Sequence, residues 1–260
     1  MINKYTKTIT ILVPIYGLGW VLNNIKIDSK IEIRFINELK KESELLKRAG
    51  FNWVKYKCLL VIKYSYNSQE VNEPYPALQF LLDEIQAALR IFNPGFIGFS
   101  GVISQPKVQP FPLLNYPAII GGPPFYKINK KKLSEFPEFY QKFKLAYKKK
   151  KIAFDWFNKS YSGVPVNKVI DYCICLENLF VPPNSHEKKK FILQGLKLLN
   201  FPQQERDKIG ILYDYRNAFI HTDYQKSLKI IKQYKITKDF YDICEKILRE
   251  TLGLYIEKPW

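Results

Sequence analysis

Arg216, Asn217 and His221 carry side chains that could act on a phosphate ester. A histidine can take up or release a proton near neutral pH, as general acid/base catalysis requires. The planar guanidinium of an arginine can hold two phosphate oxygens and stabilise negative charge on them. Asn217 and His221 are four residues apart, so on a helix they share a face, where the amide could orient the imidazole by a hydrogen bond. The three residues therefore suggest acid/base chemistry at a phosphate.

The spacing of Arg216 and His221 is uncommon for this composition, because the chain has only six arginines and two histidines. An arginine five to seven residues before a histidine is expected by composition only about 0.1 to 0.2 times. A simpler structural interpretation is that Arg216 pairs with Asp214 or a neighbouring helix, and that His221 is favoured at a helix C-terminus by the helix dipole. On an unbroken helix the two side chains would point about 140° apart. Either the helix breaks here, or a second subunit completes the site.

The C-terminal half that carries these residues is predicted to be all-helical. Apolar positions recur with the period of a helix, and no convincing strand is found. Pro182-Pro183 ends one segment, and Pro202 is tolerated in the first turn of another. Five helical segments are expected, at residues 134–159, 166–180, 187–199, from about 202 to the motif, and 238–254. They predict a helical bundle.

The N-terminal half is predicted to mix strands and helices. Stretches rich in β-branched and aromatic residues indicate strands at 8–15, 30–35, 58–66 and 96–103, and amphipathic stretches indicate helices at 37–49 and 76–92. A Pro/Gly-rich linker follows at 105–124. We therefore expect an α+β chain, with a mixed domain of unknown function at 1–125 and a helical domain at 126–260.

Two blocks of the helical half resemble the HEPN superfamily, in particular its Apea-like branch. They are residues 170–180 (IDYCICLENLF), which are similar to the acidic second-helix signature of that branch, and residues 212–221 (LYDYRNAFIH). The resemblance covers about residues 134–254. Residues 87–95 (AALRIFNPG) look like a stretch that often precedes such domains.

The resemblance implies a metal-independent endoribonuclease of the kind found in toxins and antiviral-defence proteins that act as dimers. In such enzymes the 2′-hydroxyl of the RNA attacks the adjacent phosphate. His221 would then serve as general acid/base and Arg216 would stabilise the phosphate charge, with Asn217 as the polar residue that the family prefers after the arginine.

Glu177, Tyr213 and Tyr224 are expected to support this site. Glu177 interrupts the apolar stripe of its helix, so it is either a boundary residue that reaches solvent or an inward carboxylate paired with a cation. We predict that it approaches Arg216 or the helix that carries Arg216. Tyr213, Tyr215 and Tyr224 are either core or interface aromatics or platforms for RNA bases. In some HEPN toxins a partner antitoxin modifies a tyrosine two residues beyond the histidine; Tyr224 is three residues beyond it, so this regulation is not expected.

The net charge of +17 and the isoelectric point near 9.5 suggest a polyanionic partner. The excess is +5 in residues 1–125 and +12 in residues 126–260, although a lysine-rich genome composition would also raise it. Lysine runs lie at 130–132, 148–151 and 188–190, and such runs are either solvated faces or contacts to an RNA backbone. The candidate RNA contacts are Lys148, Lys149, Lys150, Lys188, Lys189 and Lys190.

No metal site, cofactor or membrane span is expected. The four cysteines are scattered and only two histidines are present, so no zinc spacing can be assembled, and the cysteines are interpreted as buried thiols. The apolar runs are too short to cross a bilayer and no signal peptide is recognised, so a cytoplasmic location is expected.

Three functions remain open from the sequence. The first is an RNA-cleaving toxin or defence protein that dimerises through the helical domain and has an antitoxin or defence-system partner. The second is a non-catalytic HEPN module that binds nucleotide or RNA, or serves as an interaction platform. The third is a partner-regulated toxin whose target is not RNA. The N-terminal domain would sense, recruit or restrain in each of them.

Overall fold

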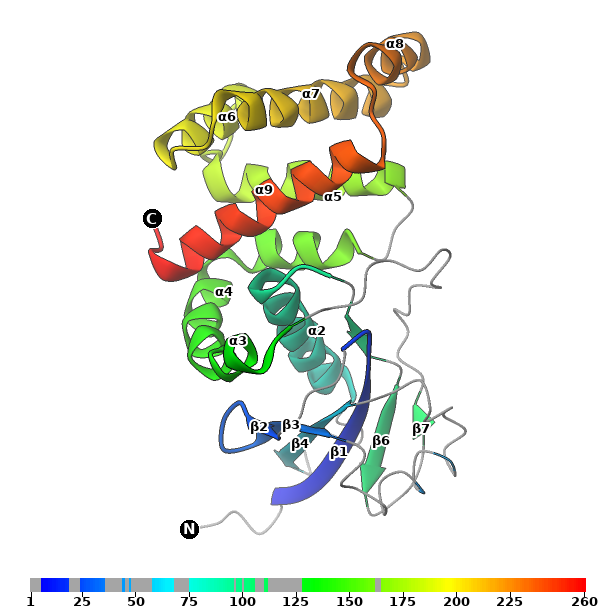
Figure 1. Cartoon of the computed structure of the whole chain (residues 1–260), viewed down its shortest axis with the longest axis vertical. Coiled ribbons are helices and arrows are strands. Elements are labelled where there is room, and N and C mark those ends of the chain that lie inside the picture. Colours follow the sequence, from blue (N-terminus) through cyan, green and yellow to red (C-terminus); the bar gives the residue numbers. More distant parts are fainter. Residues whose placement is uncertain are drawn as a thin grey trace. The chain divides into compact units, whose positions relative to one another are not determined.

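The chain divides into two compact units, Met1–Gln141 and Lys142–Trp260, in a computed structural model. The structure describes residues 6–18, 24–35, 44, 47, 58–67, 75–95, 97–99, 101–105, 110–111, 128–161 and 165–260. An antiparallel sheet with one long helix comes first in the chain and a series of helices follows, which confirms the expected α+β class (Figure 1).

The sheet of the first unit is built around β1 (Thr6–Tyr16). It pairs antiparallel with β4 (Cys58–Asn67) along its length, from Thr6 opposite Asn67 to Ile15 opposite Cys58. The other strands are β2 (Ile25–Lys26), β3 (Ile31–Phe35), β5 (Gly98–Phe99), β6 (Val102–Gln105) and β7 (Pro110–Phe111). Their order is β2-β3-β4-β1-β6-β7, and β5 pairs with β1.

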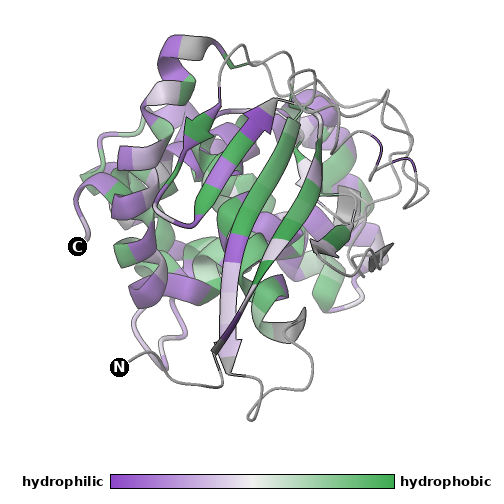
Figure 2. Ribbon diagram, turned by 90° about the horizontal axis from the view of Figure 1, so that it is seen from below, coloured by the Kyte–Doolittle hydropathy of each residue, from purple (hydrophilic) through white to green (hydrophobic). Residues whose placement is uncertain are grey.

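The two central strands carry the core of this unit. Residues 11–15 of β1 and 58–62 of β4 are buried without alternation, so both faces of the sheet are covered in this stretch. Figure 2 shows the central strands as largely apolar there. Helix α2 (Tyr75–Phe92) buries Leu78, Leu82, Ile85 and Leu89 at helical spacing.

The end of α2 is fixed by a buried hydrogen bond. Arg90 Nη2 donates to the carbonyl oxygen of Ile97 at 2.9 Å, which joins the helix to the segment that leads into β5. The chain turns between them at Asn93-Pro94-Gly95, where Gly95 has a φ of 126°. The left-handed region is open to glycine without steric cost, so this residue can close the turn that the sequence predicted.

The predicted strands and helices of this unit are recovered where the structure describes them. The strand expected at 96–103 is divided into β5 and β6. The helix expected at 37–49 lies outside the described residues except for Glu44 and Lys47, which are helical. The linker expected at 105–124 also lies outside them, apart from Gln105 in β6 and the two residues of β7.

The helical region contains more helices than the sequence predicted. Helices α4 (Phe136–Lys159), α5 (Pro165–Phe180), α6 (Lys188–Leu198), α7 (Gln203–Ile220) and α9 (Lys238–Glu257) correspond to the five expected segments. Two others, α3 (Lys130–Ser134) and α8 (Tyr224–Tyr234), were not expected. Helix α8 is capped by Asp223, whose side chain accepts a hydrogen bond from the backbone N–H of Lys226 at 2.9 Å.

Helix α7 lies at the centre of the second unit, in contact with α5, α6, α8 and α9. The apolar face predicted for α5 is buried at Val169, Cys173 and Leu176, and the stripe of α9 is buried at Phe240, Cys244, Ile247, Leu248 and Thr251. In Figure 1, α6 and α7 run side by side. None of the helices that the structure describes has the length and apolar character needed to cross a membrane.

Candidate functional site

Helix α7 ends at the predicted histidine. Ile220 is its last residue and His221 is the C-cap, with φ −82° and ψ 14°. The backbone N–H of Asp223 donates to Ala218 O at 3.0 Å, and that of Thr222 donates to Phe219 O at 3.2 Å, which is the Schellman arrangement. Thr222 takes the left-handed conformation, with a φ of 56°, that this ending requires. The helix is therefore continuous from Arg216 to its C-cap, so the break between Arg216 and His221 that the helical wheel offered as one alternative is not seen.

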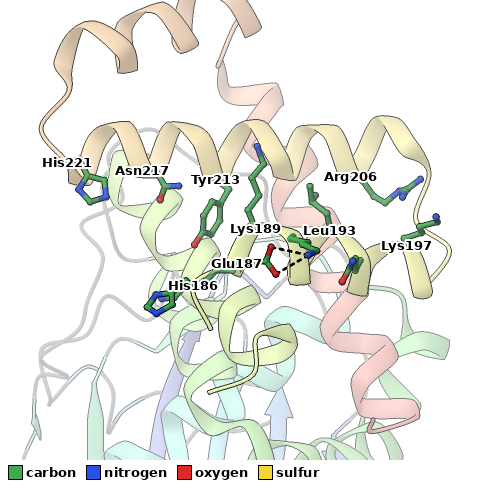
Figure 3. A pocket seen from close by; sticks show the side chains of 12 residues that line it. His186, Glu187, Lys189, Leu193, Lys197, Arg206, Tyr213, Asn217 and His221 are labelled. Carbon is green, nitrogen blue, oxygen red and sulfur yellow. Dashed lines mark hydrogen bonds and ion pairs between the residues drawn. The ribbon is translucent and has the colours of Figure 1, made fainter. Parts of the chain in front are cut away.

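The exposed side chain of His221 opens into a groove of about 830 Å³ between α6 and α7. Figure 3 shows His221 at one end of α7, with Asn217 and Tyr213 following it along the same face of the helix and His186 below Tyr213. Both histidines of the chain thus line one groove. The lining residues are His186, Glu187, Lys188, Lys189, Lys190, Leu193, Gln194, Lys197, Arg206, Tyr213, Asn217 and His221.

Arg216 is held beside this groove by three neighbours. Its Nη2 lies 3.6 Å from Oε1 of Glu177, and its Nη1 donates to Oδ1 of Asn217 at 3.0 Å. The guanidinium also stands over the ring of Tyr213, 5.6 Å from its centroid. The side chain is 18% exposed and is not among the groove-lining residues. Its Nε is buried and has no hydrogen-bond partner in the part of the chain that the structure describes, so the guanidinium keeps an unused donor.

Glu177 faces inward and reaches the helix that carries Arg216, which confirms the prediction made for it. Its side chain is 12% exposed. Besides Arg216, its carboxylate accepts a hydrogen bond from the hydroxyl of Tyr213 at 2.9 Å and one from Nζ of Lys188 at 2.8 Å. Burial, together with the hydrogen bond to Glu177, raises the pKa of the Tyr213 hydroxyl. Tyr213 is therefore a neutral hydrogen-bond donor at neutral pH.

Asn217 differs from its expected role. Its Oδ1 accepts from Arg216, and among the described residues no hydrogen bond joins its side chain to the imidazole of His221. The link between these two residues is in the backbone, where His221 N–H donates to Asn217 O at 3.1 Å. Because Asn217 lines the groove and Arg216 does not, Asn217 connects the partly buried guanidinium to the groove.

The predicted basic contacts are divided between two places. Lys188, Lys189 and Lys190 line the groove, and each is paired with a carboxylate. Their partners are Glu177, Asp214 and Glu187, at 2.8, 2.6 and 2.9 Å. Asp214 is thus held by Lys189 and not by Arg216.

Lys148, Lys149 and Lys150 lie in α4 and do not line the groove. Lys150 sits at a kink, with φ −129° and ψ 38°, and its Nζ donates to Asn178 O at 2.8 Å. Tyr224 begins α8, is 70% exposed and also stands outside the groove lining. The structure therefore gathers the lysine run at 188–190 with His221, and not the run at 148–150 or Tyr224.

Sequence reasoning missed six of the groove-lining residues, and three of them, His186, Lys197 and Arg206, carry basic side chains. Arg206 precedes Tyr213 by seven residues and Asn217 by eleven, a spacing that keeps all three on one face of α7 and could have identified it. His186 is one of only two histidines, but its loop between α5 and α6 gives no periodic signal. Lys197 is on α6, and only the packing of α6 on α7 brings it to the groove.

The described residues contain no group of three or more His, Cys, Asp or Glu side chains placed to hold a metal ion. No family model matches this chain, and no match was found among the curated proteins or the solved structures.

Proposed function

We propose that this protein is a metal-independent endoribonuclease of the HEPN type and that the groove between α6 and α7 is its RNA site. The observation that carries the proposal is that both histidines of the chain open into one basic groove, beside Arg216. Imidazoles supply proton transfer near neutral pH, and the surrounding cations favour a phosphate group.

The proposed reaction is an attack by the 2′-hydroxyl oxygen of the RNA on the adjacent phosphorus. The bond from phosphorus to the 5′-oxygen breaks as the new bond forms. The 2′-hydroxyl proton passes to a general base, and a general acid protonates the departing 5′-oxygen. His221 serves as one of these groups and His186, exposed in the same groove, is available as the other. The products are a 2′,3′-cyclic phosphate and a 5′-hydroxyl.

Arg216 and Asn217 are proposed to stabilise the charge that develops on the phosphate oxygens. The amide of Asn217 lines the groove and is held by Arg216, which has an unused Nε donor. Glu177 and Tyr213 also hold the guanidinium, so its position is set before RNA binds.

The experiment is an assay of single-stranded RNA cleavage in EDTA with end-group analysis of the products. His221→Ala should lower the rate by about 10²- to 10⁴-fold, the usual contribution of a proton-transfer group, without loss of helical signal. Arg216→Lys should lack cleavage activity, because lysine keeps the charge of arginine but lacks its planar fork of donors. Asn217→Ala should lower the cleavage rate less than His221→Ala does. If the wild-type chain shows no cleavage that these substitutions remove, the proposal is wrong.

A second candidate, a non-catalytic module that binds RNA or nucleotide, is favoured by one observation. Arg216 is mostly buried and already paired with Glu177 and Asn217, as a purely structural arginine would be. This candidate predicts binding with a steep salt dependence and no cleavage. A homodimer formed through the helical domain, an antitoxin or defence-system partner and a role in defence belong to the first proposal, and light scattering at tens of micromolar protein tests the dimer.

A further inference from the structure

The groove has two chemically different ends. His221, one of the two proposed proton-transfer groups, lies at the C-terminal end of α7. Arg206 lies near the N-terminal end of the same helix, with Lys197 of α6 beside it (Figure 3). At 1.5 Å per residue, the 15 residues between Arg206 and His221 correspond to about 22 Å. The groove is therefore too long for a single phosphate.

The cations between these ends are largely neutralised by the protein. Lys188, Lys189 and Lys190 each form an ion pair with a carboxylate. In contrast, no ion pair joins Lys197 or Arg206 to a carboxylate in the part of the chain that the structure describes. These two side chains therefore give the far end of the groove a net positive charge.

Arg206 also has an unused donor. Its Nη2 donates to Oε1 of Gln203 at 2.6 Å, but its Nε is buried and has no hydrogen-bond partner among the described residues. Because this Nε is closed to solvent, a phosphate oxygen would bind the Nη groups of the guanidinium and would meet Nε only after the side chain turns. An anion that meets the groove is thus favoured most at this end.

We propose that Arg206 and Lys197 form a second phosphate subsite, which anchors a single RNA strand several nucleotides away from the phosphate at His221. At the rise of about 3.4 Å per nucleotide of a stacked strand, 22 Å spans about six nucleotides. The strand follows α7, with one phosphate held by the charge of Arg206 and Lys197, the middle phosphates over paired lysines and the reactive phosphate at His221. This proposal rests on the proposed function for the choice of RNA and for the reactive end, but its test does not require cleavage.

The test uses fluorescence anisotropy with 2′-fluoro RNA oligonucleotides of 4, 8 and 12 nucleotides, which lack the attacking hydroxyl. For the wild-type chain, affinity should rise from 4 to 8 nucleotides and change little from 8 to 12. In the double variant Lys197→Gln/Arg206→Gln this rise should disappear. For the 12-mer the affinity at 0.1 M salt should fall about tenfold, and the slope of log K against log salt should become shallower by about 1.4, or about 0.7 for each lost phosphate contact.

The matched control is Lys229→Gln/Lys232→Gln, which removes the same charge from two exposed lysines of α8 that do not line the groove. It should keep the length dependence. If the control loses as much affinity as the groove variant, or if the groove variant keeps the rise from 4 to 8 nucleotides, the subsite is disproved. Length-dependent binding through Arg206 in a chain that does not cleave RNA would support the subsite and reject only the catalytic proposal. Circular dichroism of both variants checks that the helices are retained.

Discussion

Removal of the Glu177 carboxylate should weaken the second unit more than removal of any exposed acid. The side chain is 12% exposed and interacts with Tyr213, Lys188 and Arg216, which lie on two other helices. In Glu177→Ala the guanidinium of Arg216, 18% exposed, would lose its carboxylate while its Nε is already without a partner. The hydroxyl of Tyr213 would lose its acceptor at the same time.

The size of the loss follows from the exposure of each partner. Breaking a buried ion pair by removing one member costs about 3 to 5 kcal/mol. We expect the loss of the Arg216 pair to cost slightly less than this, because Nη2 lies 3.6 Å from the carboxylate. The pair with Lys188, which is 42% exposed, adds less than about 1 kcal/mol. We therefore expect Glu177→Ala to lower the free energy of unfolding by about 3 kcal/mol, or the melting temperature by about 10 °C.

The assay is urea and thermal unfolding of the full chain, followed by circular dichroism at neutral pH. The free energy of unfolding of Glu177→Gln should lie between those of wild type and Glu177→Ala, because the amide keeps a hydrogen-bond acceptor for Tyr213 but loses the charge. Glu187→Ala is the control, since Glu187, the N-cap of α6, is 60% exposed and among the described residues pairs with Lys190 alone; it should change stability by less than about 1 kcal/mol. A loss below about 1 kcal/mol in Glu177→Ala, or an equal loss in the control, would refute the argument.

Further predictions concern the glycines and the cysteines of the same unit. In Gly195→Ala the new Cβ would lie 2.2 Å from Cδ1 of Phe180, whose ring stacks on Trp260, so this variant should have a lower melting temperature. In Gly210→Ala the nearest atom to the new Cβ, Cε of Lys189, is 3.5 Å away. The gain in helix propensity should therefore raise the stability of this variant by up to about 1 kcal/mol. Thermal unfolding of the two variants side by side measures both, and a lower melting temperature for Gly210→Ala would contradict this view of the groove. Burial raises the pKa of the Cys173 and Cys175 thiols and raises that of Cys244 to about 12, so at pH 8 the native chain should react with a thiol reagent far more slowly than the chain in urea. Because the same thiols ionise near pH 9 when unfolded, the unfolded chain binds fewer protons above that pH, and the free energy of unfolding should fall as the pH rises further.

The sequence alone predicted the elements whose apolar periodicity is strong. Helices α5 and α9 show a stripe at helical spacing and were expected nearly where they lie, and β1 and β4 were recognised from their β-branched residues. Helix α8 was missed although Asp223 caps it, because the helix is short and buries only Ser227 and Ile230. The inward position of Glu177 was also predictable, because a carboxylate in an apolar stripe needs a cation nearby.

The groove, in contrast, was decided only by tertiary structure. Which lysines join His221 depends on the packing of α6 against α7, and no local pattern distinguishes Lys188, Lys189 and Lys190 from Lys148 and Lys149. The same packing brings His186, Lys197 and Arg206, which are 15 to 35 residues from His221 in sequence, to one surface. A sequence pattern reports spacing along one helix, whereas the neighbours of a side chain across two helices depend on how their surfaces interdigitate. For the same reason Asn217 was assigned to His221 on its own helix, while the folded chain gives its Oδ1 to Arg216, whose guanidinium is set by Glu177 on α5.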